Sequence, residues 1–591
     1  MDRALAVGVV LVFLAAFFSA YFIAGIVPEA PSILEFEEHD ELVLRVDSEG
    51  DACGEVSFYL PPSPFTDVFK QVVLLTGIES YAQSIEEELR NSFALRGLEV
   101  DNIWAVVKFN AGMRIDATLR VRRVARWTGE GWRIDFGWIN PEDAAEEELG
   151  EQEIGWLLYR SFARDSGYED ANFWQFYTTS VRLPADASGV ILLSSTNSEY
   201  VDYGGGSYLQ SSLSLEQENE VWVLSENGVR FVTTQNEFTI EPSALADNVV
   251  SLALTFSAPM PENWSFVESV EQVRLDLKFG RELRENYPVV ENGSVYWLTP
   301  AQILYNAARY LLADNAALES KGVASPENES GEWGAVWRWL SREEYRELAE
   351  RVVLEVDETG RAPGTVDTPV GRMRFRDVLY LFLRVLHQVA ENSTQPENVL
   401  VAPVPSGQLE WGAVKVPASY AYFLLPDSYV ITGTELVENV LASLPDNLDN
   451  RALAEKIADW TSSALSYSPS YSPPTSEEVL SSRRGQCRDY TNAYLALART
   501  AGLPSRRVIG WVYSSWVPPA GWGYSSTTTS EGKTVALHAW VEVYVPEEGW
   551  IPLDPQYSGV YVGELPNAPY REFRQSWVNA LAAYEVARGL L

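Results

Sequence analysis

Cysteine and histidine, which carry much of the nucleophilic and metal chemistry of proteins, are scarce here: the 591 residues include two Cys and three His. The cysteines are Cys53 and Cys487, and the histidines are His39, His387 and His538. Two sulfurs cannot form a disulfide framework, so packing must hold the chain together. Neither set has the paired spacing of zinc ligands, and we expect no metal and no other cofactor. Any place where a Cys and a His meet becomes correspondingly informative.

Basic residues are also few. Lys and Arg number 44 against 83 Asp and Glu, which gives a formal net charge of −39 at pH 7. Clustered Lys and Arg bind nucleic-acid phosphates, so this balance argues against nucleic acid as a partner and favours a neutral or polycationic one. Hydrophobic residues make up 46% of the chain, which excludes wholesale disorder. At about 150 residues per domain, the length suggests roughly three or four domains.

The longest uncharged run is residues 4–27, which contain 24 residues without a charge. As a helix this run would extend about 36 Å, more than the roughly 30 Å of a membrane's hydrocarbon core. Arg3 precedes it and Glu29 follows it, so the positive-inside rule places the N-terminus in the cytoplasm. A cleavable signal peptide is the alternative, although its apolar part is usually only about 7–15 residues long. We therefore expect residues 1–30 to be a signal-anchor of a single-pass cell-membrane protein whose bulk is extracellular.

Four sequences of the form Asn-x-Ser/Thr follow this run. They begin at Asn263, Asn292, Asn328 and Asn392. Such sequences are acceptors for N-linked glycans in exported proteins, but they are also common by chance. They agree with export without establishing it.

The remaining chain predicts an α+β protein. Residues 31–265 are strand-rich, with alternating apolar and polar residues at 103–109, 117–124 and 221–232, and a helical stretch at 67–96. Residues 266–430 are mostly helical in pattern. Residues 431–575 hold the chemical motifs, and residues 576–591 form a C-terminal helix. The strand-rich region is expected to hold the chemical part away from the membrane or to contact a partner.

Cys487 lies at a predicted helix start. Thr475 with Glu478 three residues later is a capping-box pattern for a short helix, which ends before a second helix beginning near Cys487. Gly502 and Pro504 are typical of the end of that second helix. The helix dipole and the neighbouring arginines favour the thiolate form of Cys487, although a small buried cysteine is the commoner reason for this residue at a helix start.

His538 lies on a predicted strand, residues 535–545, and is followed by a turn and a partner strand at 550–553. Asp554 ends the partner strand and should lie nearly opposite His538, where its carboxylate can orient the imidazole. An Asp-Pro strand end that simply starts a turn is the alternative interpretation.

The residues around these positions resemble a known family. The segments RRGQCRDYTNAYLALARTAGLPSRRVIGW and LHAWVEVYVPEEGWIPLDP are similar to the core of the transglutaminase-like superfamily of papain-type cysteine enzymes. The resemblance implies that Cys487 is the nucleophile, His538 the general base and acid, and Asp554 the orienting carboxylate. It also implies an oxyanion donor besides the Cys487 backbone N–H, for which Gln486, Trp460 and Tyr467 are candidates.

An aromatic loop precedes the histidine strand, and we expect it to wall a substrate cleft. Its rings, together with the one that follows His538, are Trp511, Tyr513, Trp516, Trp522, Tyr524 and Trp540. The alternative is an ordinary surface loop.

These observations predict a thiol enzyme acting on amide bonds of a protein, a wall peptide or another cell-envelope polymer through a thioester. It would be a peptidase or amidase if water accepts the acyl group, and a transglutaminase-type acyltransferase if an amine does. The alternative is a non-catalytic cell-surface binding or scaffold protein that uses the same fold.

Overall fold

The structure is a computed structural model of the 591-residue chain. It describes residues 33–136, 163, 169–195, 201–202, 207–235, 252–259, 261, 264–291, 293–313, 317–468, 474–513, 526–528, 532–546, 548–557, 563 and 565–588.

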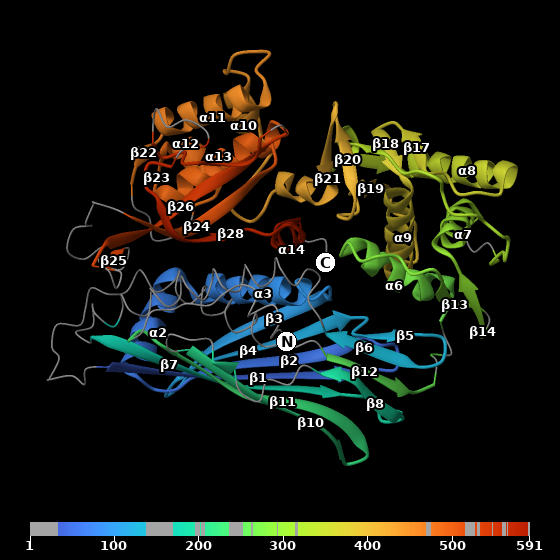
Figure 1. The fold of residues 1–591 in the computed structure, drawn as a ribbon, viewed down its shortest axis with the longest axis horizontal. Coiled ribbons are helices and arrows are strands. Elements are labelled where there is room, and N and C mark those ends of the chain that lie inside the picture. Colours follow the sequence, from blue (N-terminus) through green and yellow to red (C-terminus); the bar gives the residue numbers. More distant parts are fainter. Residues whose placement is uncertain are drawn as a thin grey trace.

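The N-terminal region is built on two sheets (Figure 1). The larger has eight strands in the order β3-β4-β2-β1-β7-β11-β10-β9, and the smaller has the order β5-β6-β12-β8. The strands predicted at 103–109, 117–124 and 221–232 are confirmed as β3, β4 and β11, and the helical stretch at 67–96 as α2 and α3. The elements are β1 (Ile33–Val46), β2 (Ala52–Leu60), α2 (Pro64–Thr76), α3 (Ile78–Ala94), β3 (Glu99–Phe109), β4 (Met113–Arg122), β5 (Ala125–Trp127), β6 (Trp132–Phe136), β7 (Asp170–Arg182), β8 (Ser188–Ser195), β9 (Val201–Asp202), β10 (Ser207–Glu218), β11 (Val221–Thr233) and β12 (Leu252–Ser257).

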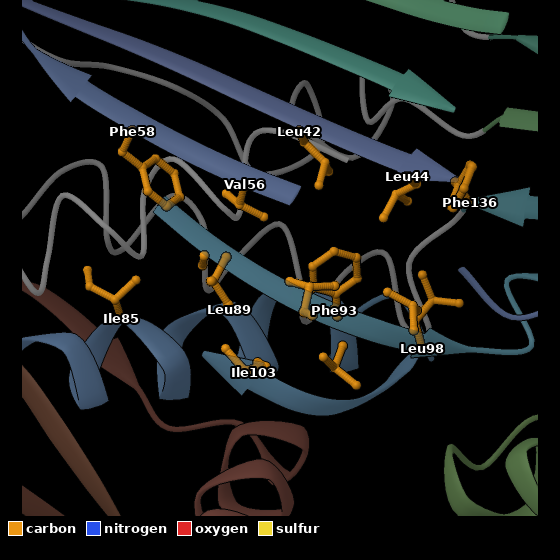
Figure 2. Close-up of a cluster of buried hydrophobic side chains, with 14 of the residues drawn as sticks. Leu42, Leu44, Val56, Phe58, Ile85, Leu89, Phe93, Leu98, Ile103 and Phe136 are labelled. Atoms are coloured by element: carbon orange, nitrogen blue, oxygen red, sulfur yellow. The ribbon is translucent and has the colours of Figure 1, made fainter. Parts of the chain in front are cut away.

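One face of the large sheet is closed by α3 (Figure 2). The helix buries Tyr81, Ile85, Leu89 and Phe93, which are spaced by four residues and therefore share one face. Alternate residues of β1 and β2 supply the opposing apolar surface, for example Leu42, Leu44, Val56 and Phe58. Each fully buried side chain of this size contributes about 1.5–3 kcal/mol. The other face of the sheet carries polar and aromatic residues.

The middle region packs four helices into a second core. Helix α9 is apolar on most of its surface and is nearly enclosed by α6, α7, α8 and short strands. The elements are α6 (Phe266–Lys278), β13 (Tyr287–Glu291), β14 (Ser294–Leu298), α7 (Pro300–Ala313), β15 (Gly331–Glu332), η1 (Trp333–Ala335), β16 (Trp339–Ser341), α8 (Arg342–Thr359), β17 (Thr365–Thr368), β18 (Gly371–Arg374), α9 (Phe375–Asn392), β19 (Asn398–Leu400), β20 (Gln408–Trp411), β21 (Val414–Pro417) and η2 (Ala418–Leu424).

The C-terminal region places helices against a five-stranded sheet in which β25-β26-β24-β28 are neighbours and β27 pairs with β26. Its core joins α10, α11, α12 and α13 to strands β26 and β27. The elements are α10 (Glu435–Leu441), α11 (Asn450–Ala464), β22 (Ser466–Tyr467), α12 (Ser476–Ser482), β23 (Arg484–Gly485), α13 (Cys487–Thr500), β24 (Ser505–Tyr513), β25 (Ser526–Thr528), β26 (Thr534–Val545), β27 (Gly549–Leu553), β28 (Pro569–Arg574) and α14 (Trp577–Arg588). The predicted C-terminal helix corresponds to α14.

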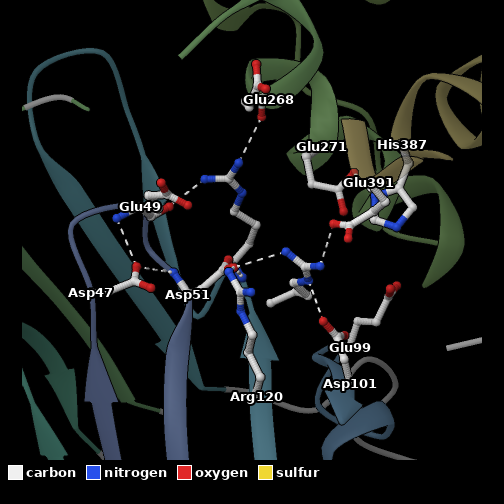
Figure 3. A network of polar contacts seen from close by, with 12 residues as sticks. Asp47, Glu49, Asp51, Glu99, Asp101, Arg120, Glu268, Glu271, His387 and Glu391 are labelled. Atoms are coloured by element: carbon white, nitrogen blue, oxygen red, sulfur yellow. Dashed lines mark hydrogen bonds and ion pairs between the residues drawn. The ribbon is translucent and has the colours of Figure 1, made fainter. Parts of the chain in front are cut away.

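The three regions are joined by shared contacts. Figure 1 shows α3 between the large N-terminal sheet and the C-terminal region. Trp511 and Val535 of the C-terminal sheet belong to the same buried cluster as the residues of α3 and the N-terminal strands. Helix α14 then packs on α3 and α6 through Val578 and Ala582. A polar contact adds to these, because Arg122 of β4 donates to Glu391 of α9 at 2.7 Å (Figure 3).

The α+β class is upheld, but the structure corrects the prediction of a transmembrane helix. Within the described residues no helix combines the length and the apolar character needed to cross a membrane. The longest of these helices, α8 and α9, have 18 residues each and carry charged side chains, whereas a span needs about 20 predominantly apolar residues. The run for which the span was predicted, residues 4–27, lies outside the described residues. The single-pass topology and the cell-membrane localisation are therefore withdrawn.

Two of the four predicted glycan acceptors, Asn328 and Asn392, are exposed. Asn263 and Asn292 lie outside the described residues. Exposure is what any surface asparagine shows, and it is no evidence for a glycan.

Candidate functional site

The short helix α12 and the turn after it set the position of Cys487. Thr475 caps α12 as predicted: its side chain accepts from the backbone N–H of Glu478, and the Glu478 carboxylate accepts from the backbone N–H of Thr475 at 2.8 Å. Arg483 ends the helix in a left-handed conformation with φ of 57°. Gly485 follows, and a side chain there would come within 2.5 Å of the Cβ of Asp489. The close approach that glycine permits turns the chain directly into α13.

Cys487 is the first residue of α13, as the sequence predicts. The buried Asp489 accepts from the backbone N–H of Gln486 at 3.0 Å, which secures the start of the helix. Cys487 is a free cysteine, and the residue as a whole is of intermediate exposure. Gly502, with φ of 86°, follows the helix at the predicted end.

His538 and Asp554 are brought together by the β26–β27 hairpin. The two strands pair in the register Val541 with Leu553, so the residue after β27 lies close to His538. The imidazole Nε2 is 2.6 Å from a carboxylate oxygen of Asp554, which is buried. The predicted proximity of the two residues is thus present in the structure. Because Nε2 faces the carboxylate, Nδ1 is the ring nitrogen left for a second partner.

That second partner is the thiol of Cys487, which forms a hydrogen bond with the His538 ring. Burial raises the pKa of Cys487, but the hydrogen bond and the charge of His538, with the backbone N–H of Ala539, outweigh it and leave the pKa lowered. Burial lowers the pKa of His538, but its bonds to Asp554 and Cys487 raise it to about 10. Both shifts favour a thiolate–imidazolium pair, which is the reactive form of a cysteine nucleophile.

The carboxylate of Asp554 is held by its own neighbours. Its second oxygen accepts from the backbone N–H of Gln556 at 3.1 Å, the pattern of an Asp that begins a turn. Tyr557 places its ring edge-on to the imidazole, with ring centroids 6.3 Å apart. The aspartate that begins this turn is therefore the same residue that bonds the imidazole.

The comparisons with known proteins concern this part of the chain. Residues 435–555 match the family model of the transglutaminase-like superfamily. These residues form a transglutaminase-like domain. The resemblance predicted from the sequence is confirmed.

Two curated proteins are similar to this domain and its surroundings. Uncharacterized protein YebA of Bacillus subtilis (strain 168) is 29% identical over 143 residues, which cover 23% of this chain and 18% of that protein. Protein-glutamine gamma-glutamyltransferase of Pseudomonas aeruginosa is 29% identical over 118 residues, which cover 17% of each chain. The chain therefore matches less than a fifth of the length of these relatives.

Two solved structures are also similar. One is the crystal structure of a protein proposed to be a protease, from Parabacteroides distasonis ATCC 8503, with 8% identity, a TM-score of 0.18, and coverage of 90% of this chain and 72% of that one. The other is red sea bream transglutaminase, with 10% identity, a TM-score of 0.10, and coverage of 60% and 43%. TM-scores this low carry no argument about shared architecture or function.

The candidate oxyanion donors of the transglutaminase-like domain lie at different places. Gln486 immediately precedes Cys487 as the N-cap of α13. Tyr467 lies on β22, which pairs with β23 so that Tyr467 is beside Gly485, and its side chain is 48% exposed. Trp460 of α11 lies farther back, with the guanidinium of Arg483 stacked 4.6 Å from its ring centroid. The backbone therefore brings Gln486 and Tyr467 to the segment that leads into Cys487.

The aromatic residues predicted to wall a cleft divide into three groups. Trp511 is fully buried in the core shared with α3, so it does not line a cleft, which corrects that prediction. Trp540 is also buried, and its ring lies 6.2 Å from the imidazole of His538, where it supports the ring. Tyr513 is partly buried at the end of β24. Trp516, Trp522 and Tyr524 lie outside the described residues.

Two of the arginines near Cys487 have other partners in the structure: Arg488 is paired with Asp489 at 3.2 Å, and Arg483 covers Trp460. The backbone N–H of Ala539 was missed, because a strand pattern does not show which amide faces a distant helix. The hydrogen bond from the Gln556 backbone N–H to the Asp554 carboxylate could have been predicted from the sequence, since Asp commonly accepts from the backbone N–H two residues later.

The lowered pKa of Cys487 predicts a specific pH dependence. The thiolate is the alkylated form, so the iodoacetamide rate should rise through a pKa below the usual value of about 8.5. In His538→Ala the contributions that lower the pKa are lost and burial remains, so the rise should move to higher pH. The measurement is rate against pH by mass spectrometry in a Cys53→Ser background, which removes the exposed second thiol. If the alkylation rate of Cys487 depends on pH in the same way with and without His538→Ala, the thiol–imidazole pairing is contradicted.

Proposed function

We propose that the transglutaminase-like domain is a thiol enzyme that acts on amide bonds of proteins or peptides. The observation that carries the proposal is the chain of contacts from thiol to imidazole to carboxylate, with 2.6 Å between His538 and Asp554. In this proposal Cys487 is the nucleophile, His538 moves the proton and Asp554 holds the imidazole in orientation.

The chemistry follows from these contacts. The Cys487 thiolate attacks the amide carbonyl carbon, and the carbonyl oxygen becomes an oxyanion near the start of α13, where the Cys487 backbone N–H can donate to it. The C–N bond then breaks, and the His538 imidazolium gives its proton to the leaving nitrogen. This leaves a thioester on Cys487. His538 next removes a proton from the acceptor, which attacks the thioester and releases the thiolate.

The acceptor decides between two activities. Water gives a peptidase or amidase, and an amine gives an acyltransferase. The Pseudomonas relative is named as a protein-glutamine gamma-glutamyltransferase, so the side-chain amide of protein glutamine is the first acyl donor to test.

The test is incubation of the full chain with a glutamine-rich protein and a biotinylated primary amine, followed by peptide mass spectrometry. Amine incorporation at glutamine indicates transfer, and conversion of glutamine to glutamate or backbone cleavage indicates hydrolysis. Cys487→Ala serves as the control and should give none of these products. Complete absence of products from the unaltered chain, with a Cys487 thiol that alkylates only at high pH, would favour the binding or scaffold role instead.

A further inference from the structure

A large hollow lies on the N-terminal sheet, far along the chain from the thiol. Its volume is about 990 Å³, at the upper end of the roughly 300–1,000 Å³ of small-molecule sites. Its lining comes from six adjacent strands: β4, β2, β1, β7, β11 and β10. The side chains that line it alternate with the buried residues that face α3, so the hollow lies on the opposite face of the sheet.

An aromatic row crosses this face. His39 is paired with Tyr59 on one side and with Phe176 on the other, so three rings stand on neighbouring strands. The rings of His39 and Phe176 are stacked, with centroids 5.0 Å apart and planes 15° apart, and Tyr59 lies 6.2 Å from His39. The pairing continues to Arg114 at one end. The row therefore forms a platform of three aromatic rings on the sheet surface.

A row of polar residues runs parallel to the aromatic row. Each of its members lies two residues away, on the same strand, from a position in the aromatic row. Glu41 is paired with Ser57 and with Thr178, Thr178 with Asn227, and Asn227 with Ser212. The Thr178 hydroxyl donates to the Asn227 side-chain oxygen at 2.9 Å, which orients the amide with its N–H groups toward other partners. Hydroxyls, one amide and one carboxylate thus border the aromatic platform.

Besides His39, the titratable residues of the lining that carry a formal charge at pH 7 are Asp40, Glu41 and Arg114. The guanidinium of Arg114 is already bound to Asp116 at 2.7 Å, and Glu41 is the exposed carboxylate of the polar row. The neutral hydrogen-bonding residues that line the hollow include Ser57, Thr178, Gln210, Ser212 and Asn227. An anionic ligand would meet Glu41 and a chain of net charge −39, so the lining best matches a ligand that is neutral and rich in hydroxyls.

We propose that this hollow binds a neutral oligosaccharide. The C–H groups of pyranose rings are weakly positive and pack against aromatic side chains, and Tyr59 and Phe176 are aromatic residues that line the hollow. Sugar hydroxyls both donate and accept, so Glu41 can accept from them while Asn227 and the serine and threonine hydroxyls do both. The lining comes from six neighbouring strands about 4.8 Å apart, a width that can hold several sugar units. The site is independent of the proposed amide chemistry.

The test is calorimetric titration of the full chain with cellohexaose, chitohexaose, xylohexaose and maltohexaose, at low and high salt. At least one should bind, with an affinity that salt leaves nearly unchanged, because no charge is neutralised. Phe176→Ala should weaken this binding about tenfold or more through the lost ring contact. Asn227→Ala changes the polar row and removes no ring, and it should also weaken saccharide binding. Trp339→Ala removes an exposed ring of the middle region and should leave binding intact.

Hexalysine is the discriminating probe. Binding of hexalysine that disappears at high salt, without binding of any saccharide, would overturn the proposal in favour of a cationic peptide. Failure of all four saccharides to bind would also overturn it. So would saccharide binding that Phe176→Ala and Asn227→Ala both leave unchanged while their melting temperatures match that of the unaltered chain.

Discussion

Cys487→Ala is expected to remove amide turnover almost completely, by on the order of 10⁶-fold as for the loss of a nucleophile in comparable triads. The physical reason is that no other described group lies where it could attack a carbonyl beside His538. His538→Ala should cause a similar loss, since the leaving nitrogen then receives no proton. Asp554→Asn should cost about 10⁴-fold, because an amide can hold the imidazole in the wrong tautomer. The measurement is turnover of the acyl donor that the incubation with a glutamine-rich protein identifies.

Two features make this prediction decisive. Cys487 begins a helix and is partly exposed, so its truncation removes little core volume and the melting temperature should stay unchanged. The losses should also fail to add in Cys487→Ala/His538→Ala, because both changes stop the same step. Cys53→Ser is the matched control and should keep full activity. If Cys487→Ala retains measurable turnover, the assignment is wrong; if it unfolds the domain, the thiol is structural.

Glu99→Ala is expected to destabilise the protein by about 3–5 kcal/mol. Glu99 of β3 accepts from Arg274 at 2.9 Å and from Lys278 at 2.8 Å, both on α6, and all three side chains are buried. Burial raises the pKa of Glu99, but the two cations outweigh it and lower the pKa far below the usual range. Lys278 also pairs with Glu585 of α14 at 2.6 Å. Removing the carboxylate would take one of two carboxylate partners from each of two buried cations, where all three regions of the chain meet.

The surroundings of Glu99 show why the effect should be large. Arg274 also pairs with Glu271 of α6 at 2.6 Å, and Glu271 in turn lies 3.2 Å from Nδ1 of His387 on α9; Figure 3 labels Glu99, Glu271 and His387. Burial raises the pKa of Glu271, but Arg274 and His387 lower it to about 2, so Glu271 stays ionised as Glu99 does. Removing one member of a buried group of ion pairs lowers the free energy of unfolding by more than the whole group contributes to it, because the remaining ions stay desolvated.

The measurement for Glu99 is urea unfolding followed by circular dichroism, with hydrogen exchange of β3 and α6 to locate the change. Glu55→Ala is the matched control: it removes a strand carboxylate paired with Arg45 at 2.8 Å, but both side chains are exposed, so the cost should stay below about 1 kcal/mol. Equal effects of the two substitutions would show that the buried cluster contributes no more than a surface pair.

The sequence by itself determined the local arrangement of the site. The capping pattern at Thr475, the helix start at Cys487 and the hairpin that carries His538 depend on spacing within about 15 residues, where backbone periodicity and turn chemistry decide the outcome. The approach of Asp554 to His538 followed from the same hairpin. The strands of the N-terminal sheet depend on patterns that are equally local, and the sequence predicted those at 103–109, 117–124 and 221–232.

Long-range burial was decided only by the tertiary structure. Trp511 reads as a loop aromatic, yet it is enclosed because α3 packs against its sheet from over 400 positions away in the chain. The aromatic and polar rows of the hollow come from strands whose order, β4-β2-β1-β7-β11-β10, no local pattern encodes. The same holds for Glu99, whose partners lie on α6. Alternation shows that a residue faces one side of its strand, but sheet order and inter-region packing decide what lies on that side, and these depend on contacts between distant segments.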